Sequence, residues 1–143
     1  YIQLVIAVKD KNCGLGDDFR QIVCKIMGGI LNEMGHKPIL INGVNDHLHI
    51  FFGMNPKISL SETVKELKRR TTIFINNQGY CNQKFQWQHG YGAFSYSRSH
   101  IDNVYNYIKN QENHHKKSSF ETEYRIFLKK YGLEHDERFL FEF

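Results

Sequence analysis

The order of the apolar segments predicts an α+β fold in which a largely antiparallel sheet carries helices on one face. The chain reads as strand, helix, strand, strand, helix and strand, which is the split βαβ arrangement. It has 143 residues, the size of one domain. Hydrophobic residues make up 41% of it, which is enough for a core. We therefore expect one domain spanning residues 1–143, with an added helix towards its C-terminal end.

The first expected elements are a buried strand and an amphipathic helix. Residues 1–9 read YIQLVIAVK, an apolar and β-branched run that is typical of a buried strand. After a loop that contains glycines, Asp17 and Asp18 open a helix whose apolar residues recur at helical spacing. Gly35 is expected to end this helix in a left-handed conformation.

A hairpin is expected next. Residues 37–44 and 47–53 are predicted strands, and Asn45 and Asp46 between them form the turn. Asn and Asp tolerate the positive φ angles that two-residue hairpin turns prefer. The two strands should therefore pair with each other in antiparallel orientation.

The second half of the chain is expected to be mainly helical. Ser59 or Ser61 caps the next helix, and Ser99 caps the one after the last strand. The predicted bounds are 59–77 for the second helix, 93–96 for a short strand, 99–111 for the third helix and 120–131 for a fourth helix.

Cysteine spacing and hydropathy indicate the compartment. The sequence has three cysteines, an odd number, at positions 13, 24 and 81, and none of them forms a CxxC pair. Neither a disulfide framework nor a thiolate zinc site is therefore expected. The sequence has no run of about 18 apolar residues and no signal-peptide pattern. We therefore expect a protein of the reducing cytoplasm that does not enter a membrane.

Basic side chains gather at two places, although the formal net charge is only +4. One group is Lys65, Lys68, Arg69 and Arg70, and the other is the HHKK run at 114–117. Basic clusters beside aromatic side chains suit a nucleic-acid backbone with stacked bases. The first group is thus a candidate for contacts with a DNA backbone, although composition alone favours ordinary solvated helix faces.

The sharpest local motif is His47-Leu48-His49 in the segment NDHLHIFFG. Residues i and i+2 of a strand point to the same face, so both imidazoles project together while Leu48 turns into the core. Two neutral imidazoles on one face can bind a divalent cation. An isolated pair of this kind is more often two exposed histidines on an open sheet face.

Tyr107 and Gln111 form the second motif, because residues four apart share one helix face. The Gln111 carbonyl oxygen can join the two histidines on a metal, with the Tyr107 hydroxyl near it as a nucleophile. Tyr107 taken alone is better explained as a packing residue. Tyr105 is the nearest rival nucleophile, but it lies about 160° around the helix from Tyr107, and we expect it to pack.

Taken together, the two motifs supply what cleavage of a phosphodiester requires. The reaction needs a nucleophile in line and positive charge beside the non-bridging oxygens. A site of two nitrogens and one oxygen leaves positions open for phosphate and water, which suits Mg²⁺ or Mn²⁺. A tyrosine nucleophile keeps the strand covalently attached, so the strand can be rejoined elsewhere.

Histidine-hydrophobic-histidine on a strand, followed by Tyr-x-x-x-Gln on a later helix, resembles the signature of the HUH endonucleases. The order of the motifs is similar to that of the single-tyrosine transposases of bacterial insertion sequences, including domesticated relatives associated with palindromic repeats. The likeness covers nearly the whole chain. It includes the segments NGVNDHLHIFFG, LSETVKELKRRTTIFIN, KFQWQHGYGAFSYSRSHIDNVYNYIKNQENHHKK and FLKKYGLEHDERFLF.

The resemblance implies a ferredoxin-like or RRM-like fold and a homodimer that cleaves and rejoins single-stranded DNA at the ends of an insertion sequence. Such transposases recognise hairpins near those ends and form a 5′-phosphotyrosine intermediate. Carried onto this sequence, Tyr107 is the nucleophile, and His47, His49 and Gln111 hold Mg²⁺ or Mn²⁺. Asp46 is a candidate for orienting His47, although a turn-forming role is simpler. The expected location is the bacterial cytoplasm, at the nucleoid when DNA is bound.

The main alternative is a non-catalytic, domesticated protein that binds single-stranded DNA or RNA hairpins with the same fold. RRM-like sheets bind RNA through exposed aromatic residues, whereas this strand carries His47 and His49, and a binder has no need of Gln111. A replication initiator or relaxase shares the chemistry but is usually part of a larger protein. A metallohydrolase that activates water would leave Tyr107 idle.

Overall fold

The structure is a computed structural model of the chain, and it describes residues 1–110. Its helices and strands are β1 (Ile2–Ala7), α1 (Asp17–Glu33), β2 (Lys37–Val44), β3 (His47–Gly53), α2 (Leu60–Asn77), β4 (Gly92–Ser95) and α3 (Ile101–Lys109), with short 3-10 helices at Lys11–Cys13 and Arg98–His100. The predicted helix over 120–131 and the basic run at 114–117 lie outside the described residues. None of the described helices is long and apolar enough to cross a membrane.

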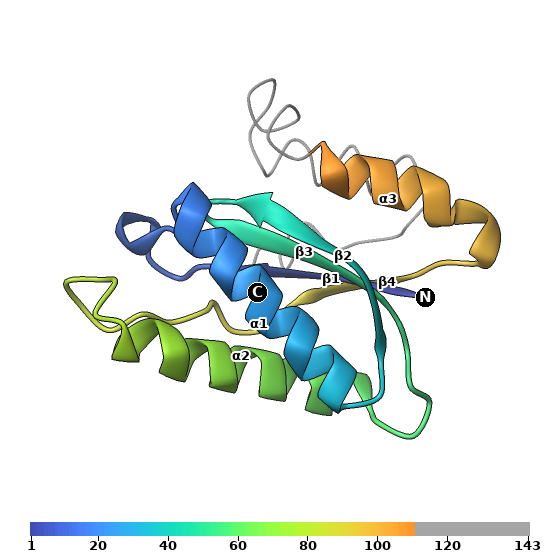
Figure 1. The fold of residues 1–143 in the computed structure, drawn as a ribbon, viewed down its shortest axis with the longest axis horizontal. Coiled ribbons are helices and arrows are strands. Elements are labelled where there is room, and N and C mark those ends of the chain that lie inside the picture. The colour runs from blue at the N-terminus through green and yellow to red at the C-terminus, as the bar shows by residue number, and fades with distance from the viewer. Residues whose placement is uncertain (111–143) are drawn as a thin grey trace.

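The four strands form one antiparallel sheet in the order β2-β3-β1-β4. Helices α1 and α2 cover one face of this sheet, and α3 lies across the other face (Figure 1). The predicted α+β class with a split βαβ arrangement is therefore confirmed. The sheet has two covered faces, and this creates a second, smaller core beneath α3.

The main core lies between the sheet and the helix pair α1 and α2. Alternate residues of β1 and β3 point into it, which is the two-residue period of a strand. Fully buried side chains from these strands include Leu4, Ile6, Leu48, Ile50 and Phe52. Burying a side chain of this size contributes about 1.5–3 kcal/mol, so this face holds the sheet and both helices together.

The end of α1 and the start of α2 agree with the predictions from the sequence. Gly35 follows α1 with a φ of 80°, the left-handed conformation that glycine adopts without strain. Of the two candidate serine caps of α2, Ser59 is the one used, because its hydroxyl accepts a hydrogen bond from the Glu62 amide at 3.1 Å.

The start of α3 differs from the prediction. Ser99 does not cap the helix; it lies inside the short 3-10 helix, closed by the hydrogen bond from the His100 amide to the Ser97 carbonyl at 3.0 Å. The Ser99 hydroxyl instead lies 2.8 Å from the Ser97 hydroxyl. Because the preceding turn already holds the backbone, α3 begins two residues after Ser99, at Ile101.

The hairpin turn between β2 and β3 has a different backbone from the one predicted. No residue other than glycine has a positive φ within residues 1–110, so the turn at Asn45 and Asp46 closes with negative φ angles. Tertiary hydrogen bonds hold it. The Val8 amide donates to the Asp46 carbonyl at 2.8 Å, and the Leu15 amide donates to the Asn45 carbonyl at 2.7 Å.

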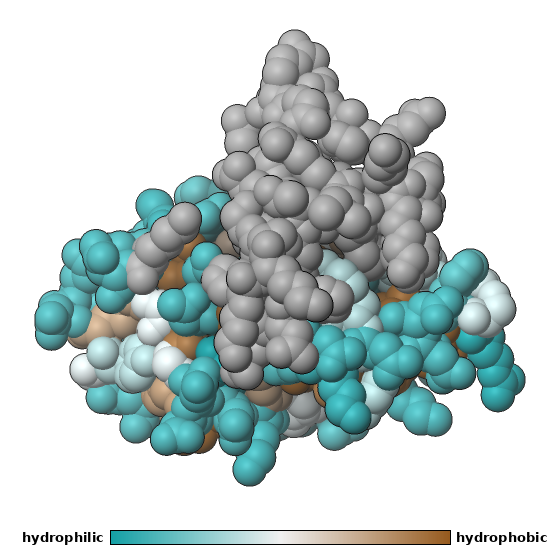
Figure 2. All heavy atoms as spheres, turned by 90° about the horizontal axis from the view of Figure 1, so that it is seen from above, coloured by the Kyte–Doolittle hydropathy of each residue, from teal (hydrophilic) through white to brown (hydrophobic). Residues whose placement is uncertain are grey.

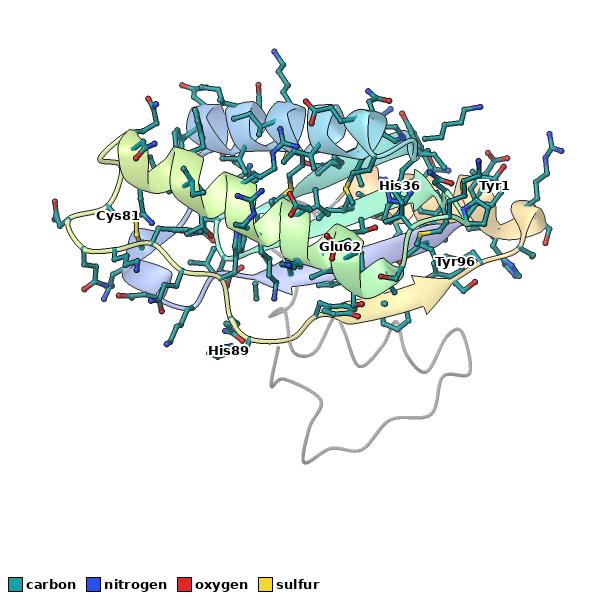
Figure 3. The ribbon with its side chains drawn as sticks, turned by 90° about the horizontal axis from the view of Figure 1, so that it is seen from below. Tyr1, His36, Glu62, Cys81, His89 and Tyr96 are labelled. Atoms are coloured by element: carbon teal, nitrogen blue, oxygen red, sulfur yellow. A yellow bond between two sulfur atoms is a disulfide. The ribbon has the colours of Figure 1, made fainter. Side chains whose placement is uncertain are left out.

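Cys13 and Cys81 form a disulfide, with their Cα atoms 5.5 Å apart, so the prediction of unpaired cysteines is wrong for these two. The fold brings two loops together, and beside the disulfide the Gly16 amide donates to the Tyr80 hydroxyl at 2.7 Å. In Figure 3, Cys81 lies at the opposite end of the molecule from Tyr1 and Tyr96. Cys24 is a free thiol, and its burial raises its pKa to about 11.

Candidate active site

The pairing of β3 places His47 and His49 on the face of the sheet that α3 covers. His47 lies opposite Ala7, and His49 lies opposite Val5 on β1 and Asn42 on β2. Both histidines are buried, with exposed fractions of 1% and 2%, and their ring centroids are 5.3 Å apart. The interpretation as two exposed histidines on an open face is therefore wrong.

Gly43 allows the close approach of β2 and β3 beside these histidines. A Cβ atom added at Gly43 would lie 2.9 Å from the Leu48 Cα and would also overlap the His47 carbonyl oxygen. Both contacts are with the backbone of the strand that carries the histidines. A side chain at Gly43 would thus push β3 away from β2 at His47, the first residue of β3.

Helix α3 brings Tyr107 to the histidines. Val104 and Ile108 are fully buried and pack with Phe51 in the second core. This packing turns Tyr107 towards β3, with its ring centroid 5.8 Å from that of His49 and an interplanar angle of 82°. Tyr105 is 36% exposed, so the expectation that it packs is wrong.

The Asp46 carboxylate holds the His47 ring. Its Oδ1 atom lies 2.7 Å from the His47 Nδ1 atom. Since a carboxylate only accepts hydrogen bonds, a neutral His47 carries its proton on Nδ1 and its lone pair on Nε2. Asp46 is thus at once a residue of the hairpin turn and the partner of His47.

Two residues that the motifs did not identify hold His49. The Gln3 side-chain nitrogen lies 2.8 Å from the His49 Nδ1 atom, and the Tyr96 hydroxyl donates to the Gln3 oxygen at 2.8 Å. The sequence does contain a signal for Gln3, because it is a polar residue inside the apolar run IQLVIA. Tyr96 carries no comparable signal, since a tyrosine after a strand is commonplace.

Asn42 is a third residue that sequence reasoning missed. Its side-chain amide donates to the carbonyls of Ile108 and Lys109 at 3.2 and 3.4 Å. These carbonyls belong to the last turn of α3, where helical backbone has no partner of its own. Asn42 thus anchors the end of the tyrosine helix to the strand that pairs with His49.

We expect Asn42→Val to loosen the end of α3 without unfolding the domain. The variant loses hydrogen bonds worth about 0.5–1.5 kcal/mol each, so hydrogen–deuterium exchange in α3 should accelerate several-fold. Asn76→Val is the matched control, because Asn76 makes two comparable bonds to the Phe85 backbone on α2's side of the sheet. Equal protection of α3 in both variants would contradict the anchoring role.

The donor set of the histidine pair fits a divalent cation that has a further ligand. Within residues 1–110, no three His, Cys, Asp or Glu side chains gather in a way that could hold a metal. His47 and His49 instead present two buried Nε2 atoms on one face while their Nδ1 atoms engage Asp46 and Gln3. The predicted third ligand, Gln111, lies outside the described residues.

The basic residues of α2 divide between two sides of the helix. Lys65, Lys68 and Arg69 line an open groove of about 840 Å³ between α2 and residues 84–90. Lys9 and Lys84 add to the same lining, and none of the described residues that line it is acidic. The groove lies on the α2 side of the sheet, opposite the histidines.

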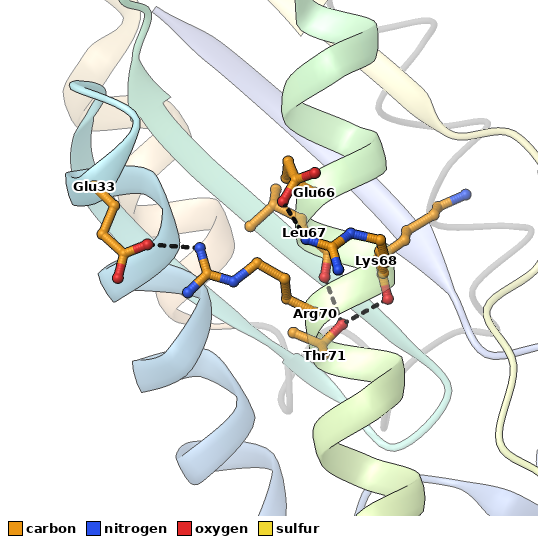
Figure 4. Close-up of polar contacts among 7 residues, drawn as sticks. Glu33, Glu66, Leu67, Lys68, Arg70 and Thr71 are labelled. Carbon is orange, nitrogen blue, oxygen red and sulfur yellow. Dashed lines mark hydrogen bonds and ion pairs between the residues drawn. The ribbon is translucent and has the colours of Figure 1, made fainter.

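Several of these cations have intramolecular partners. Arg70 lies outside the groove and reaches Glu33 on α1 at 2.6 Å, as Figure 4 shows. Arg69 pairs with Glu66 at 2.8 Å. Lys68 donates to the carbonyls of Gln88 and Gly90, and its half-buried position lowers the pKa of its ammonium group. Lys68 therefore tethers the 84–90 segment to α2.

Seen from the α3 side, the visible described surface is mainly hydrophilic, with hydrophobic residues in small separate patches (Figure 2). Large exposed apolar side chains are scattered over the described residues, among them Ile22 and Ile73 on the two helices of the other face. Such scattered residues are normal for a protein surface. The visible surface thus gives no sign of a large apolar docking patch.

Comparisons with known proteins agree with this fold. The family model described as "Transposase IS200 like" matches residues 1–111. A structure of a candidate transposase from Deinococcus radiodurans R1 superposes with a TM-score of 0.61 at 21% identity, covering 77% of this chain and 88% of that one. A REP-associated tyrosine transposase bound to a REP hairpin gives a TM-score of 0.62 at 13% identity, covering 80% and 67%. No curated protein matches the chain.

Proposed function

The chain belongs to the family of IS200-like transposases, and from that premise we propose that it cleaves and rejoins single-stranded DNA through a covalent bond to Tyr107. The observation that carries the proposal is the approach of Tyr107 to His49, with ring centroids 5.8 Å apart. Strand pairing and helix packing, rather than neighbouring positions in the sequence, bring the hydroxyl-bearing residue to the histidine pair.

The proposed reaction exchanges one phosphodiester for another. The Tyr107 oxygen attacks the phosphorus, a bond from phosphorus to the tyrosine oxygen forms, and the bond to the 3′ oxygen breaks. The phenolic proton is lost and the departing 3′ oxygen gains a proton, which leaves a 5′-phosphotyrosine and a free 3′ hydroxyl. Attack by a second 3′ hydroxyl on the same phosphorus reverses these steps and releases Tyr107. Bond energy is retained throughout, so rejoining needs no external energy source.

His47, His49 and Gln111 are the proposed ligands of Mg²⁺ or Mn²⁺. When bound, this ion would offset the negative charge that develops on the non-bridging oxygens. The chain's own contribution is orientation. Asp46 holds the His47 ring, and Asn42 holds the last turn of the helix that carries Tyr107. Positioning of this kind accounts for a large share of catalysis in phosphoryl transfer.

We propose that the substrate carries a DNA hairpin and that the groove beside α2 contacts its backbone. A wholly basic set of charged lining residues supports this, because phosphate contacts dominate the affinity of proteins for DNA. One structural neighbour is described as bound to a REP hairpin. We also propose that the protein acts in the bacterial cytoplasm as a homodimer. Light scattering of the purified protein tests the oligomeric state.

Removing two cations from the groove is expected to weaken hairpin binding and flatten its salt dependence. In the variant Lys65→Ala/Arg69→Ala, up to two phosphate contacts are lost. The negative slope of the log binding constant against log salt concentration should therefore become shallower by up to about 1.8. Fluorescence anisotropy with a labelled hairpin measures both quantities. The matched control is Lys37→Ala/Lys57→Ala, which removes two exposed lysines outside the groove. Equal loss in both variants would show that only net charge matters.

The experiment that tests the proposed activity is a search for the covalent intermediate. The protein is incubated with labelled single-stranded DNA from the ends of the element, with Mg²⁺ or Mn²⁺ and, in parallel, with EDTA. A protein–DNA adduct on a denaturing gel that requires the metal is the expected result. Tight binding of the same DNA without an adduct under either metal would overturn the catalytic proposal in favour of a domesticated binding protein.

A further inference from the structure

Gln3 is a polar side chain buried in the middle of the sheet. It lies on β1, is 0% exposed, and faces the same side as His47 and His49 because it pairs with Phe51. Its amide connects two side chains from distant parts of the chain, the His49 Nδ1 atom and the Tyr96 hydroxyl, each at 2.8 Å. A buried polar group costs free energy unless it is hydrogen-bonded, so this network is well suited to hold one arrangement.

The orientation of the Gln3 amide decides which nitrogen of His49 carries the proton. If the amide NH₂ group faces His49, Nδ1 must accept and the proton of a neutral ring lies on Nε2. If the amide is turned by 180°, its oxygen accepts from Nδ1–H, and Nε2 carries the lone pair. The Tyr96 hydroxyl serves both cases, because a hydroxyl both donates and accepts.

We propose that Gln3 is a positioning residue, which sets the tautomer and orientation of His49 so that its Nε2 lone pair is presented to the metal. This rests on the proposed function, in which His49 is a metal ligand. The structure has the Gln3 nitrogen towards His49 and its oxygen towards Tyr96. The metal-binding arrangement is the same amide turned by 180°, in which the Gln3 oxygen accepts from His49 Nδ1–H and the NH₂ group donates to the Tyr96 oxygen. Partners of this kind that orient a metal-binding histidine change metal affinity by about 10–100-fold.

Burial explains why an amide holds His49 while a carboxylate holds His47. The Asp46 side chain is 21% exposed, so water still solvates its charge. Gln3 has no exposure, and a carboxylate at its position would be desolvated at a large cost. An amide supplies the same accepting oxygen without a buried charge, and Tyr96 fixes its direction.

The test compares Gln3→Met, Gln3→Glu and Tyr96→Phe with the unchanged protein. Titration calorimetry with Mn²⁺ measures affinity, and nitrogen-resolved NMR of the His49 ring in the absence of metal identifies the tautomer that the protein itself imposes. Gln3→Met should lower Mn²⁺ affinity about 10–100-fold and mix the two tautomers. Gln3→Glu should keep affinity and the Nδ1–H tautomer, since a carboxylate can only accept, while lowering thermal stability. Tyr96→Phe should fall between the two in affinity.

Thr63→Val is the matched control, because Thr63 makes a buried 2.8 Å hydrogen bond to the ring of His36 on the other face of the sheet. It should lower thermal stability without changing Mn²⁺ affinity. If Gln3→Met behaves in the same way and keeps one His49 tautomer, Gln3 is merely structural and the inference is overturned. If the unchanged protein binds no Mn²⁺ in calorimetry, the proposed metal site itself fails. If instead the unchanged protein and Gln3→Met bind Mn²⁺ equally well, the metal site stands and only the role of Gln3 fails.

Discussion

Replacing Tyr107 by phenylalanine is expected to abolish the covalent protein–DNA adduct. Phenylalanine has no oxygen to bond to phosphorus, so no 5′-phosphotyrosine can form, and strand rejoining disappears with it. The aromatic ring that contacts His49 is kept, so the thermal stability of the domain and its affinity for hairpin DNA should stay close to those of the unchanged protein. Denaturing gels with labelled single-stranded DNA and either metal measure the adduct.

Tyr105→Phe is the matched control for this experiment. Tyr105 lies on the same helix and is 36% exposed, and helical geometry places it about 160° around the helix from Tyr107. The Tyr105→Phe variant should form the adduct at the same rate as the unchanged protein. An adduct that persists in Tyr107→Phe and is lost in Tyr105→Phe would assign the nucleophile to Tyr105 and overturn the role proposed for Tyr107.

The second large effect is expected from removing both histidines. In His47→Ala/His49→Ala, Mn²⁺ binding should be lost, and adduct formation should fall by about a thousandfold, since a bound metal ion supplies several kcal/mol of charge stabilisation. The two rings are buried, so some loss of thermal stability is expected as well. Calorimetry with Mn²⁺ and a time course of adduct formation give the two readouts separately.

His36→Gln separates the loss of a metal site from the loss of a buried ring. His36 is 4% exposed and bonds to Thr63 and to the Asn55 amide on the α1 and α2 side of the sheet. This variant should be less stable and should still bind Mn²⁺. If adduct formation falls equally in the two proteins when both are assayed well below their melting temperatures, the histidine pair has no special role.

Local periodicity was sufficient for most of the fold. The predicted bounds of β2 and β3 agree with the structure, and β4 begins at Gly92, one residue before its predicted start. Gly35 ends α1 as expected. These features depend on short-range effects, namely strand alternation, helix capping and left-handed glycine, which a sequence records within a few residues. Fold class follows from the order of such elements, because few arrangements bury all of their apolar faces.

Local reasoning was wrong where contacts between distant segments decide the outcome. The hairpin turn has no positive φ because the amides of Val8 and Leu15 hold its carbonyls. Cys13 and Cys81 pair because two loops meet at one end of the molecule, which cysteine spacing does not encode. Ser99 differs from these cases, because a local 3-10 turn just before α3, and not a distant contact, closes the backbone there.

The sequence by itself determined which residue types are available for the chemistry, and that His47 and His49 share one face of a strand. Only the tertiary structure decided that this face is covered, that Tyr107 rather than Tyr105 faces it, and that Gln3, Tyr96 and Asn42 hold the surrounding groups. The physical reason is the range of the interactions. Alternation along a strand is fixed by local backbone geometry, whereas the hydrogen bonds around His49 and α3 join segments that meet only when the sheet and the second core form.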